Sequence, residues 1–362
     1  MKIGLVTFHC SYNFGSALQA WALKHKLEEM GHSVDVVDYR GGDFDQYKLI
    51  RTDSPKSFVS SLLFYSKNRR RARAFEGFIE ANFNCTKRYC VRNECEMGEL
   101  AASYDAFVCG SDQIWNLDCT QGPVGPFFLS FAGKAKRVAY APSLSHVSFQ
   151  GENFDKAAKK KISAWLEQYE AISVREEATA FLFQELTTKR IEACVDPTLL
   201  LDASDYEQIV ADDDVAPNML FVYMLEVNQK LVEYATEVAK AFGYHIGYVS
   251  KRAVDFGVPA TNYYGVGPGE FLGLIGQSSA VLTNSFHATV FSLLYGKPFQ
   301  TFATEKSGSR MIELLGKLGA ADRITKGESV CRPVSAPSGE LEQGLKKLRT
   351  DSLAFLTRAL GE

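Results

Sequence analysis

A histidine in a helix-capping turn is the residue of this sequence best placed to do chemistry. Thr283-Asn-Ser-Phe-His287 follows an apolar, strand-like segment and opens a helix that Asn284 or Ser285 can cap. The N–H groups at the start of a helix favour an anion, and a phosphate bound there would keep His287 protonated. His287 is therefore a candidate general acid, but a histidine with no chemical role would fit the same turn.

Three cationic side chains lie where they could hold an anionic substrate. Arg175 sits at a strand–helix junction, where its guanidinium could bind a phosphate or carboxylate through two hydrogen bonds. An ion pair with a neighbouring glutamate, or with Asp196 after the next strand, is an equally good interpretation of the same spacing. Lys306 and Arg310 precede another helix and could add cations, or could belong to an ordinary surface loop.

A polar turn follows the first apolar strand, in the segment His9–Ser16. Asn13 or Ser16 can cap the helix that follows, and Gly15 would let a ligand approach the helix N–H groups. The segment lacks the G-x-G-x-x-G pattern of dinucleotide-binding proteins, and an ordinary capped turn would look the same.

A second polar turn, Gly110–Asn116, follows another apolar strand. It holds Ser111, Asp112 and Gln113, whose side chains could bind sugar hydroxyls. The alternative is a structural turn with an Asx hydrogen bond, anchored by the Trp115 side chain.

Composition and charge place the chain among ordinary globular proteins. Of its 362 residues, 46% are hydrophobic, 23% charged and 12% aromatic, proportions too apolar for a disordered chain. The 40 basic and 43 acidic residues give a net charge of −3, which argues against nucleic acid as the main partner. The longest apolar run, Phe58–Tyr65, is far shorter than the ~20 residues of a membrane-spanning helix. The N-terminus lacks the pattern of a signal peptide, so we expect a cytoplasmic protein.

Five basic residues lie in the segment Lys67–Arg73. Most such runs form the solvated face of a helix, but this one could also lie against anionic lipid headgroups at the inner face of the membrane.

The cysteines predict neither a disulfide framework nor a metal site. The chain has eight cysteines, and Cys85, Cys90 and Cys95 follow no familiar zinc or iron–sulfur spacing. We therefore expect reduced thiols and no bound metal.

Hydrophobic periodicity predicts two series of alternating strands and helices. The first begins with a β-α-β unit over residues 3–39, which requires parallel strands, and the acidic segment 202–217 separates it from the second. Further strands are expected at 106–109, 137–141, 171–174 and 191–195, and then at 219–225, 245–249, 280–283 and 298–302. We predict an α/β fold of two doubly wound domains, 1–205 and 206–335, with a C-terminal helix within 336–362 that either domain could bind.

Taken together, the polar segments resemble the polysaccharide pyruvyl transferase family. Five segments carry the resemblance, in the expected order over residues ~1–310: Tyr12–Gln19, Gly110–Asn116, Ser173–Glu177, Asp196–Leu200, and Ser285–His287 running on through Lys297-Pro298. The resemblance implies a GT-B-like pair of Rossmann-like domains with a cleft between them, the N-terminal domain on the acceptor side and the C-terminal domain on the donor side.

The resemblance also implies a reaction and roles for individual residues. The family transfers pyruvate from phosphoenolpyruvate to two hydroxyls of one hexose, forming a ketal in a capsule, exopolysaccharide or other cell-envelope precursor, which can be lipid-linked. Phosphoenolpyruvate is then a co-substrate, and no cofactor is implied. His287 matches the catalytic histidine and Arg175 the donor-binding arginine, and we expect them to meet across the cleft. Further donor contacts are expected from Ser285, Phe286, Lys306 and Arg310, and acceptor contacts from Asn13, Gly15, Gln19, Ser111, Asp112 and Gln113.

Two other functions fit the same elements. One is a GT-B-type glycosyltransferase that uses a nucleotide-sugar and releases a nucleoside diphosphate. The other is a non-catalytic protein that binds a sugar phosphate, which would have no need of a general acid.

Overall fold

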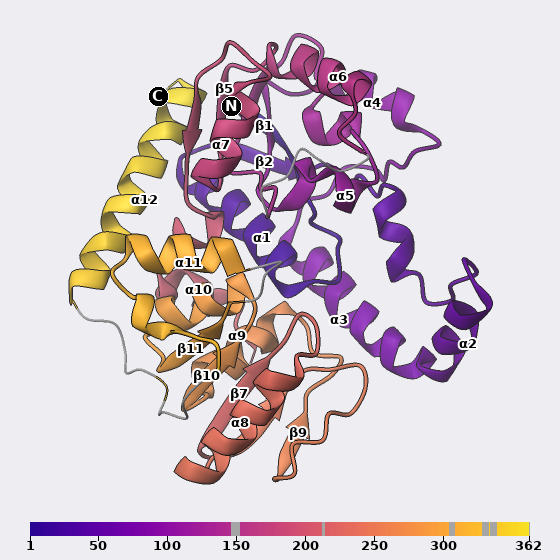
Figure 1. Cartoon of the computed structure of the whole chain (residues 1–362). Coiled ribbons are helices and arrows are strands. Elements are labelled where there is room, and N and C mark those ends of the chain that lie inside the picture. The colour runs from indigo at the N-terminus through magenta and orange to yellow at the C-terminus, as the bar shows by residue number, and fades with distance from the viewer. Residues whose placement is uncertain (146–152, 212–213, 304–307, 328–332, 334–338, 362) are drawn as a thin grey trace. The chain divides into compact units, whose positions relative to one another are not determined.

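The chain divides into two compact units, each an α/β domain with its own sheet (Figure 1). The structure is a computed structural model that describes every residue except 146–152, 212–213, 304–307, 328–332, 334–338 and 362. Unit 1 comprises Met1–Lys48, Ile79–Leu201 and Lys347–Glu362, and unit 2 comprises Leu49–Phe78 and Asp202–Lys346. Among the helices described, none is long and apolar enough to cross a membrane.

Unit 1 is built on a six-stranded parallel sheet in the order β2-β1-β3-β4-β5-β6. Its strands are β1 (Lys2–Val6), β2 (Ser33–Val36), β3 (Ala106–Cys109), β4 (Lys136–Ala139), β5 (Ala171–Val174) and β6 (Ile191–Ala193). Every residue of β3 is buried, as expected for a central parallel strand covered on both faces. In β1, Leu5 pairs with Val36 of β2 on one side and with Val108 of β3 on the other. Strand β1 therefore lies between the next two strands of the chain, and the order of strands reverses between β1 and β3.

Except at the C-terminal end of the chain, the helices of unit 1 connect consecutive strands. They are α1 (Phe14–Glu29), α4 (Met97–Ala101), α5 (Leu117–Thr120), α6 (Lys156–Leu166), α7 (Glu177–Gln184) and the part of α12 (Gly339–Leu360) that begins at Lys347. Aromatic side chains fill the core beside them: Trp115 stacks on Phe128 with ring centroids 5.1 Å apart, and its edge faces Tyr169. These large buried rings fix the loop that follows β3.

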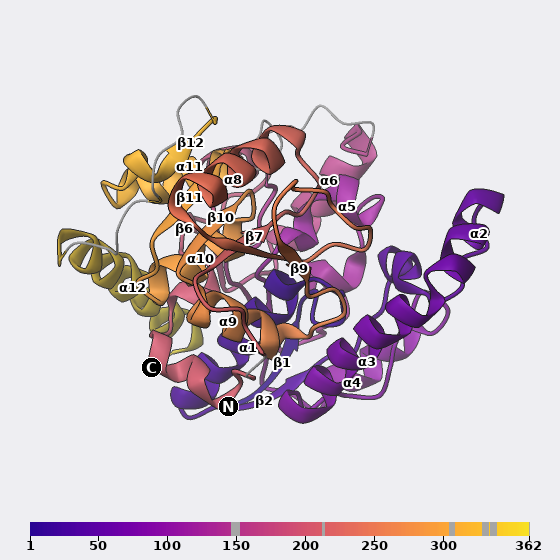
Figure 2. The same cartoon turned by 90° about the horizontal axis from the view of Figure 1, so that it is seen from below.

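Unit 2 is built on a second six-stranded parallel sheet, in the order β12-β11-β10-β7-β8-β9. Its strands are β7 (Met219–Tyr223), β8 (His245–Tyr248), β9 (Ala260–Asn262), β10 (Ala280–Thr283), β11 (Phe299–Phe302) and β12 (Ile324–Thr325). Its helices are α2 (Pro55–Leu63), α3 (Tyr65–Asn82, to Phe78), α8 (Gln229–Phe242), α9 (Pro268–Gln277), α10 (Phe286–Leu294) and α11 (Gly308–Lys317). Figure 2 labels β7 and β9 to β12, together with α8 to α11. The strand order is that of a Rossmann fold, and it reverses between β7 and β10.

The predicted fold class, two doubly wound α/β domains, is confirmed by the two parallel sheets. The strands that were not predicted, β9 and β12, are short and lie at the two edges of the unit 2 sheet.

The units differ from the predicted ranges 1–205 and 206–335 in two segments. Residues 49–78 belong to unit 2, because α3 packs on the loop before α9: Tyr264 donates to Asn68 over 3.4 Å, and Gly265 lies against the Arg70 side chain. The chain from Lys347 belongs to unit 1, because Arg349 donates to the backbone carbonyls of Leu199 and Leu201. Both differences arise from contacts between segments that are distant in sequence.

Candidate functional site

The carboxyl ends of the strands place polar residues beside the point where each sheet reverses its order. Open parallel sheets bind ligands at such a point, because the loops on its two sides diverge and leave room between them. In unit 1 these loops follow β1 and β3, and in unit 2 they follow β7 and β10.

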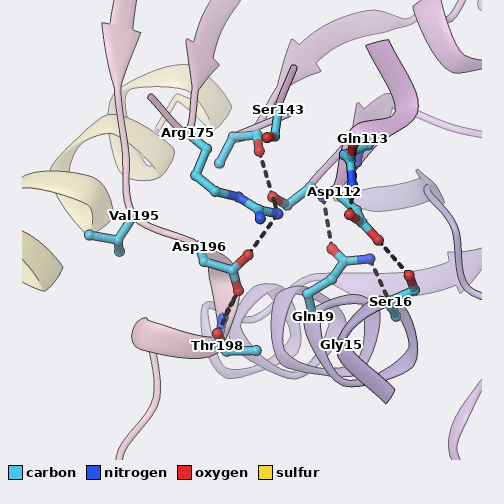
Figure 3. Close-up of polar contacts among 12 residues, drawn as sticks. Gly15, Ser16, Gln19, Asp112, Gln113, Ser143, Arg175, Val195, Asp196 and Thr198 are labelled. Atoms are coloured by element: carbon cyan, nitrogen blue, oxygen red, sulfur yellow. Dashed lines mark hydrogen bonds and ion pairs between the residues drawn. The ribbon is translucent and has the colours of Figure 1, made fainter. Parts of the chain in front are cut away.

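The loop after β1 ends in a capped helix. The Asn13 Oδ1 accepts hydrogen bonds from the N–H groups of Gly15 (2.9 Å) and Ser16 (3.4 Å), so Asn13 is the N-cap of α1. The Ser16 hydroxyl donates to the Asp112 carboxylate, which links the start of α1 to the loop after β3 (Figure 3). The structure therefore brings three predicted acceptor residues, Asn13, Gly15 and Asp112, to the reversal point of unit 1.

Gln19 is fully buried and holds the loop after β3 in place. Its Nε2 donates to the Thr7 hydroxyl (2.9 Å) and the Ser16 carbonyl (2.9 Å), and its Oε1 accepts from the Ser111 N–H (2.9 Å). These contacts are those of a positioning residue: Gln19 orients Ser111, which is itself fully buried.

The Asp112 side chain makes a hydrogen bond within its own turn, but to the N–H of the next residue and not to the N–H two residues on, as the Asx turn that the sequence offered would require. Its Oδ1 accepts from the Gln113 N–H (2.9 Å), and its backbone is in the left-handed region with φ of 67°. Gln113 is half-buried, and its Oε1 accepts from the Asn116 amide over 2.9 Å. The turn places the Asp112 carboxylate and the Gln113 amide at the carboxyl end of β3 (Figure 3).

Arg175 forms the ion pair with Asp196 that the spacing also allowed. Its Nη2 lies 2.7 Å from the Asp196 Oδ2 (Figure 3). The same nitrogen donates to the Ser111 hydroxyl over 2.6 Å. The side chains are 3% and 0% exposed, so this is a buried pair. Asp196 also accepts from the Thr198 N–H over 2.9 Å. Together these bonds fix the guanidinium at the carboxyl end of β5.

Glu176, the neighbour of Arg175, is a buried carboxylate that sequence reasoning did not assign to the site. It accepts from the hydroxyls of Ser143, which follows β4, and of Thr179 (2.8 Å), in α7. In the sequence, the one feature that could have indicated a role for Glu176 is its position directly after a predicted strand. With Asp112 and Asp196, Glu176 makes the polar groups at this edge of unit 1 rich in hydrogen-bond acceptors, the property that sugar hydroxyls need.

A buried charge cluster at the carboxyl ends of β1 and β2 was also missed. Asp38 contacts His9 (Nε2 to Oδ1, 3.2 Å), Arg40 (2.8 Å) and Arg88 (3.1 Å). Burial by itself would raise the pKa of Asp38, but the hydrogen bonds and charges of His9 and Arg40 lower it well below its usual range. The Cys10 sulfur lies within 4.8 Å of the His9 and Asp38 ligand atoms, a possible metal geometry. Because two arginines already match the Asp38 charge, the cluster fits a network of ion pairs better than a metal site.

In unit 2, Asn284 spans the reversal point of the sheet. Its side chain accepts from the Leu225 N–H (2.9 Å) and donates to the Glu226 carbonyl (3.2 Å), tying the loop after β10 to the loop after β7. Of the two predicted caps, Ser285 is the N-cap of α10, and its hydroxyl accepts from the Ala288 N–H over 3.4 Å.

The first turn of α10 gathers three of the predicted donor-side residues. His287 is 8% exposed, and its ring lies edge-on to Phe286 with centroids 5.3 Å apart. Arg310, from α11, places its guanidinium 5.4 Å from the Phe286 ring. Ser285, Phe286, His287 and Arg310 therefore lie together, whereas Lys306 lies outside the described residues. A helix N-terminus beside an arginine is an arrangement that favours an anion.

Comparisons with known proteins agree with this fold. A protein assigned as a UDP-N-acetylglucosamine 2-epimerase from Listeria monocytogenes has a TM-score of 0.53 and 10% identity, over 99% of this chain and 90% of that chain. The S. aureus MnaA structure with UDP has a TM-score of 0.49 and 10% identity, over 99% and 90% of the two chains. At such low identity, the first likeness shows the fold alone, a GT-B-like pair of Rossmann-like units. No curated protein matches the sequence.

The sequence profile of the polysaccharide pyruvyl transferase family matches residues 13–305, which is most of the chain. The match covers both reversal points, from the cap of α1 in unit 1 to the first turn of α10 in unit 2. The chain belongs to the polysaccharide pyruvyl transferase family.

Proposed function

We propose that the protein transfers pyruvate from phosphoenolpyruvate to two hydroxyls of one hexose in a polysaccharide or cell-envelope precursor, forming a pyruvate ketal. Family membership supports the transferase class. The observation that carries the proposed donor is the first turn of α10, where His287 lies beside Phe286 and Phe286 lies beside Arg310. This turn combines a candidate acid with groups that favour an anion.

The reaction requires an acid close to a bound phosphate. His287 would protonate the methylene carbon of phosphoenolpyruvate, making the adjacent carbon oxocarbenium-like and leaving a neutral imidazole. One sugar hydroxyl would attack that carbon and lose its proton. The bond between the carbon and the phosphate oxygen would then break, and the phosphate would leave with a proton. The second hydroxyl would attack the same carbon and close the ketal ring. Of the two protons that the hydroxyls lose, one would leave with the phosphate and the other would return to the His287 imidazole.

The residues of unit 1 have two proposed roles. The Asp112 carboxylate and the Gln113 amide would bind the sugar hydroxyls, with Asn13, Gly15 and Ser16 supporting them from α1. Arg175 remains the proposed donor-binding arginine. Its bonds to Asp196 and Ser111 hold the guanidinium in one orientation, and a bound donor would share that positive charge with Asp196.

The test measures phosphate release from phosphoenolpyruvate with a panel of nucleotide-linked and lipid-linked hexoses as acceptors. We expect acceptor-dependent release and a product that carries a pyruvate ketal. His287→Ala should lower the rate by about 10²–10⁴-fold, with an unchanged unfolding temperature. His245→Ala is the matched control, because His245 is half-buried on β8 of the same unit and bonds Thr261.

Two results would contradict the proposal in different places. Substantial activity of His287→Ala would remove His287 as the acid while leaving the reaction intact. A thermal shift with a nucleotide-sugar, together with release of a nucleoside diphosphate and no consumption of phosphoenolpyruvate, would replace the reaction by glycosyl transfer.

A further inference from the structure

Helix α2 exposes an apolar face. Phe58, Val59, Leu62 and Leu63 are 43%, 54%, 50% and 76% exposed. Residues three and four apart lie on the same side of a helix, so these four side chains form one continuous face. Ser61 is the buried residue of α2, and the helix therefore packs little of its own apolar surface. Large side chains gathered on an exposed face usually mark an interaction site.

Helix α3 follows α2 directly along the chain (Figure 2), and it exposes a basic face. Arg69, Arg70 and Arg73 are exposed at helical spacing and, with Tyr65 and Ser66, line a hollow. The opposite face of α3 carries its buried residues, which include Ala72, Phe75 and Phe78. Packing therefore fixes the arginine face toward solvent.

Positive charge is concentrated in this part of the chain. Residues 49–78 hold seven basic and two acidic residues, a net charge of +5 in a chain whose net charge is −3. Lys251 joins them, with its ammonium 4.9 Å from the ring of Phe64, the residue that connects α2 and α3. Burial, and then the charges of Arg71, Arg252 and Arg51, lower the pKa of Lys251, a sign of crowded positive charge.

We propose that the α2–α3 surface, defined as Phe58, Val59, Leu62, Leu63, Arg69, Arg70 and Arg73, docks the protein on an anionic lipid bilayer. Its two parts match the two layers of a bilayer surface: the arginines meet anionic headgroups, and the α2 side chains enter the acyl boundary. The proposal is independent of the reaction that the enzyme performs.

Charge complementarity favours a bilayer over other occupants. A second copy of this chain would bring the same basic segment against itself, and like charges repel. A nucleic acid would match the arginines, but it would leave Leu62 and Leu63 without a partner. An anionic bilayer uses both parts of the surface.

The test compares vesicles of equal parts phosphatidylcholine and phosphatidylglycerol with vesicles of phosphatidylcholine alone, using the full chain in a sedimentation assay. We expect binding to the anionic vesicles at low salt, weakened by added salt because screening reduces the headgroup attraction. Arg69→Gln/Arg70→Gln/Arg73→Gln should lower the partition coefficient by about a hundredfold. Leu62→Ser/Leu63→Ser should lower it by about tenfold or more.

Matched variants in unit 1 separate this surface from general effects of charge and hydrophobicity. Lys156→Gln/Lys160→Gln/Arg190→Gln removes three exposed charges, and Val91→Ser/Phe181→Ser removes two side chains that are 65% and 72% exposed. Both control variants should bind as the unchanged chain does. Far-UV circular dichroism checks that every variant is folded, and the salt dependence of the unchanged chain tests the proposal without any variant.

Three outcomes would overturn the proposal. The first is no binding to the anionic vesicles at low salt. The second is binding that survives both α2–α3 variants or that the control variants weaken equally. The third is that the protein does not bind vesicles but forms a concentration-dependent dimer, which Leu62→Ser/Leu63→Ser abolishes. That result would assign the surface to a second copy of the chain.

Discussion

Replacing Asp196 by asparagine should destabilise unit 1 strongly, because the Arg175 guanidinium would keep its charge but lose its carboxylate partner. The pair is joined over 2.7 Å, and the two side chains are 3% and 0% exposed. Breaking a buried ion pair from one side costs about 3–5 kcal/mol. That is a large part of the ~5–15 kcal/mol that holds a typical domain folded.

Tryptophan fluorescence during urea unfolding is the appropriate assay. The chain has three tryptophans, Trp21, Trp115 and Trp165, and all lie in unit 1, so their emission reports on this unit separately from unit 2. With a urea slope of ~1–3 kcal/mol per molar, a cost of about 3–5 kcal/mol should lower the midpoint by roughly 1–5 M.

The control is the ion pair between Arg358 and Glu192, which also lies within unit 1 and is joined over 2.9 Å, but whose side chains are 58% and 29% exposed. Glu192→Gln should cost less than about 1 kcal/mol. Arg175→Met/Asp196→Leu should recover much of the stability lost by Asp196→Asn, because it removes both charges together. If Asp196→Asn costs no more than Glu192→Gln, the reasoning from burial is refuted.

Two further predictions use the same fluorescence assay. The pKa of Asp38 is lowered in the folded protein, so its stabilising effect is complete above the unfolded pKa of about 4 and is lost as pH falls below it. The difference in urea midpoint between the unchanged chain and Asp38→Asn should therefore narrow below about pH 4; a difference that stays constant down to about pH 3 would contradict this. Gly110→Ala should destabilise unit 1 by about 3 kcal/mol or more, since its Cβ would lie 2.0 Å from the Tyr140 carbonyl oxygen at a φ of 117°. Gly98→Ala, at a position in α4 with nothing within 4 Å, should be harmless, and equal effects of the two substitutions would refute the steric argument.

Local patterns in the sequence were sufficient to predict most strands of the two sheets and the turns beside them. The apolar strands and the two pairs of candidate caps depend on residues close together in the chain, so periodicity and capping rules reach them. The structure then selects Asn13 and Ser285 as the caps. The strand order could not be predicted, because it depends on which strands pair with one another and how their buried faces pack. That order nevertheless explains the positions of Asp112 and Asn284, since each lies at the point where the strand order of its sheet reverses.

Long-range packing determined what the sequence left open. From the sequence alone, Arg175 could bind either an anion or Asp196. The choice depends on the fold of the neighbouring loops, which place the Asp196 carboxylate 2.7 Å from the guanidinium. Gln19 resembled a substrate contact by its place in the family pattern, but its burial beneath Ser111 depends on a loop 92 positions away. The segment 49–78 is likewise assigned to unit 2 only by contacts such as that between Tyr264 and Asn68.

The path of the chain between the units has a consequence for how the protein is made. The chain passes from one unit to the other four times, and the loop that carries Asp196 is completed by α12, where Arg349 donates to the Leu199 carbonyl 150 residues earlier. Domains that are continuous in sequence can fold one after another as they leave the ribosome. Here synthesis begins and ends with unit 1. The Ser352 hydroxyl accepts a hydrogen bond from the Val195 N–H, and this bond can form only after all of unit 2 has been synthesised. A nascent chain that stops before α12 would leave this edge of unit 1 open, so unit 1 cannot be completed before unit 2 has been synthesised.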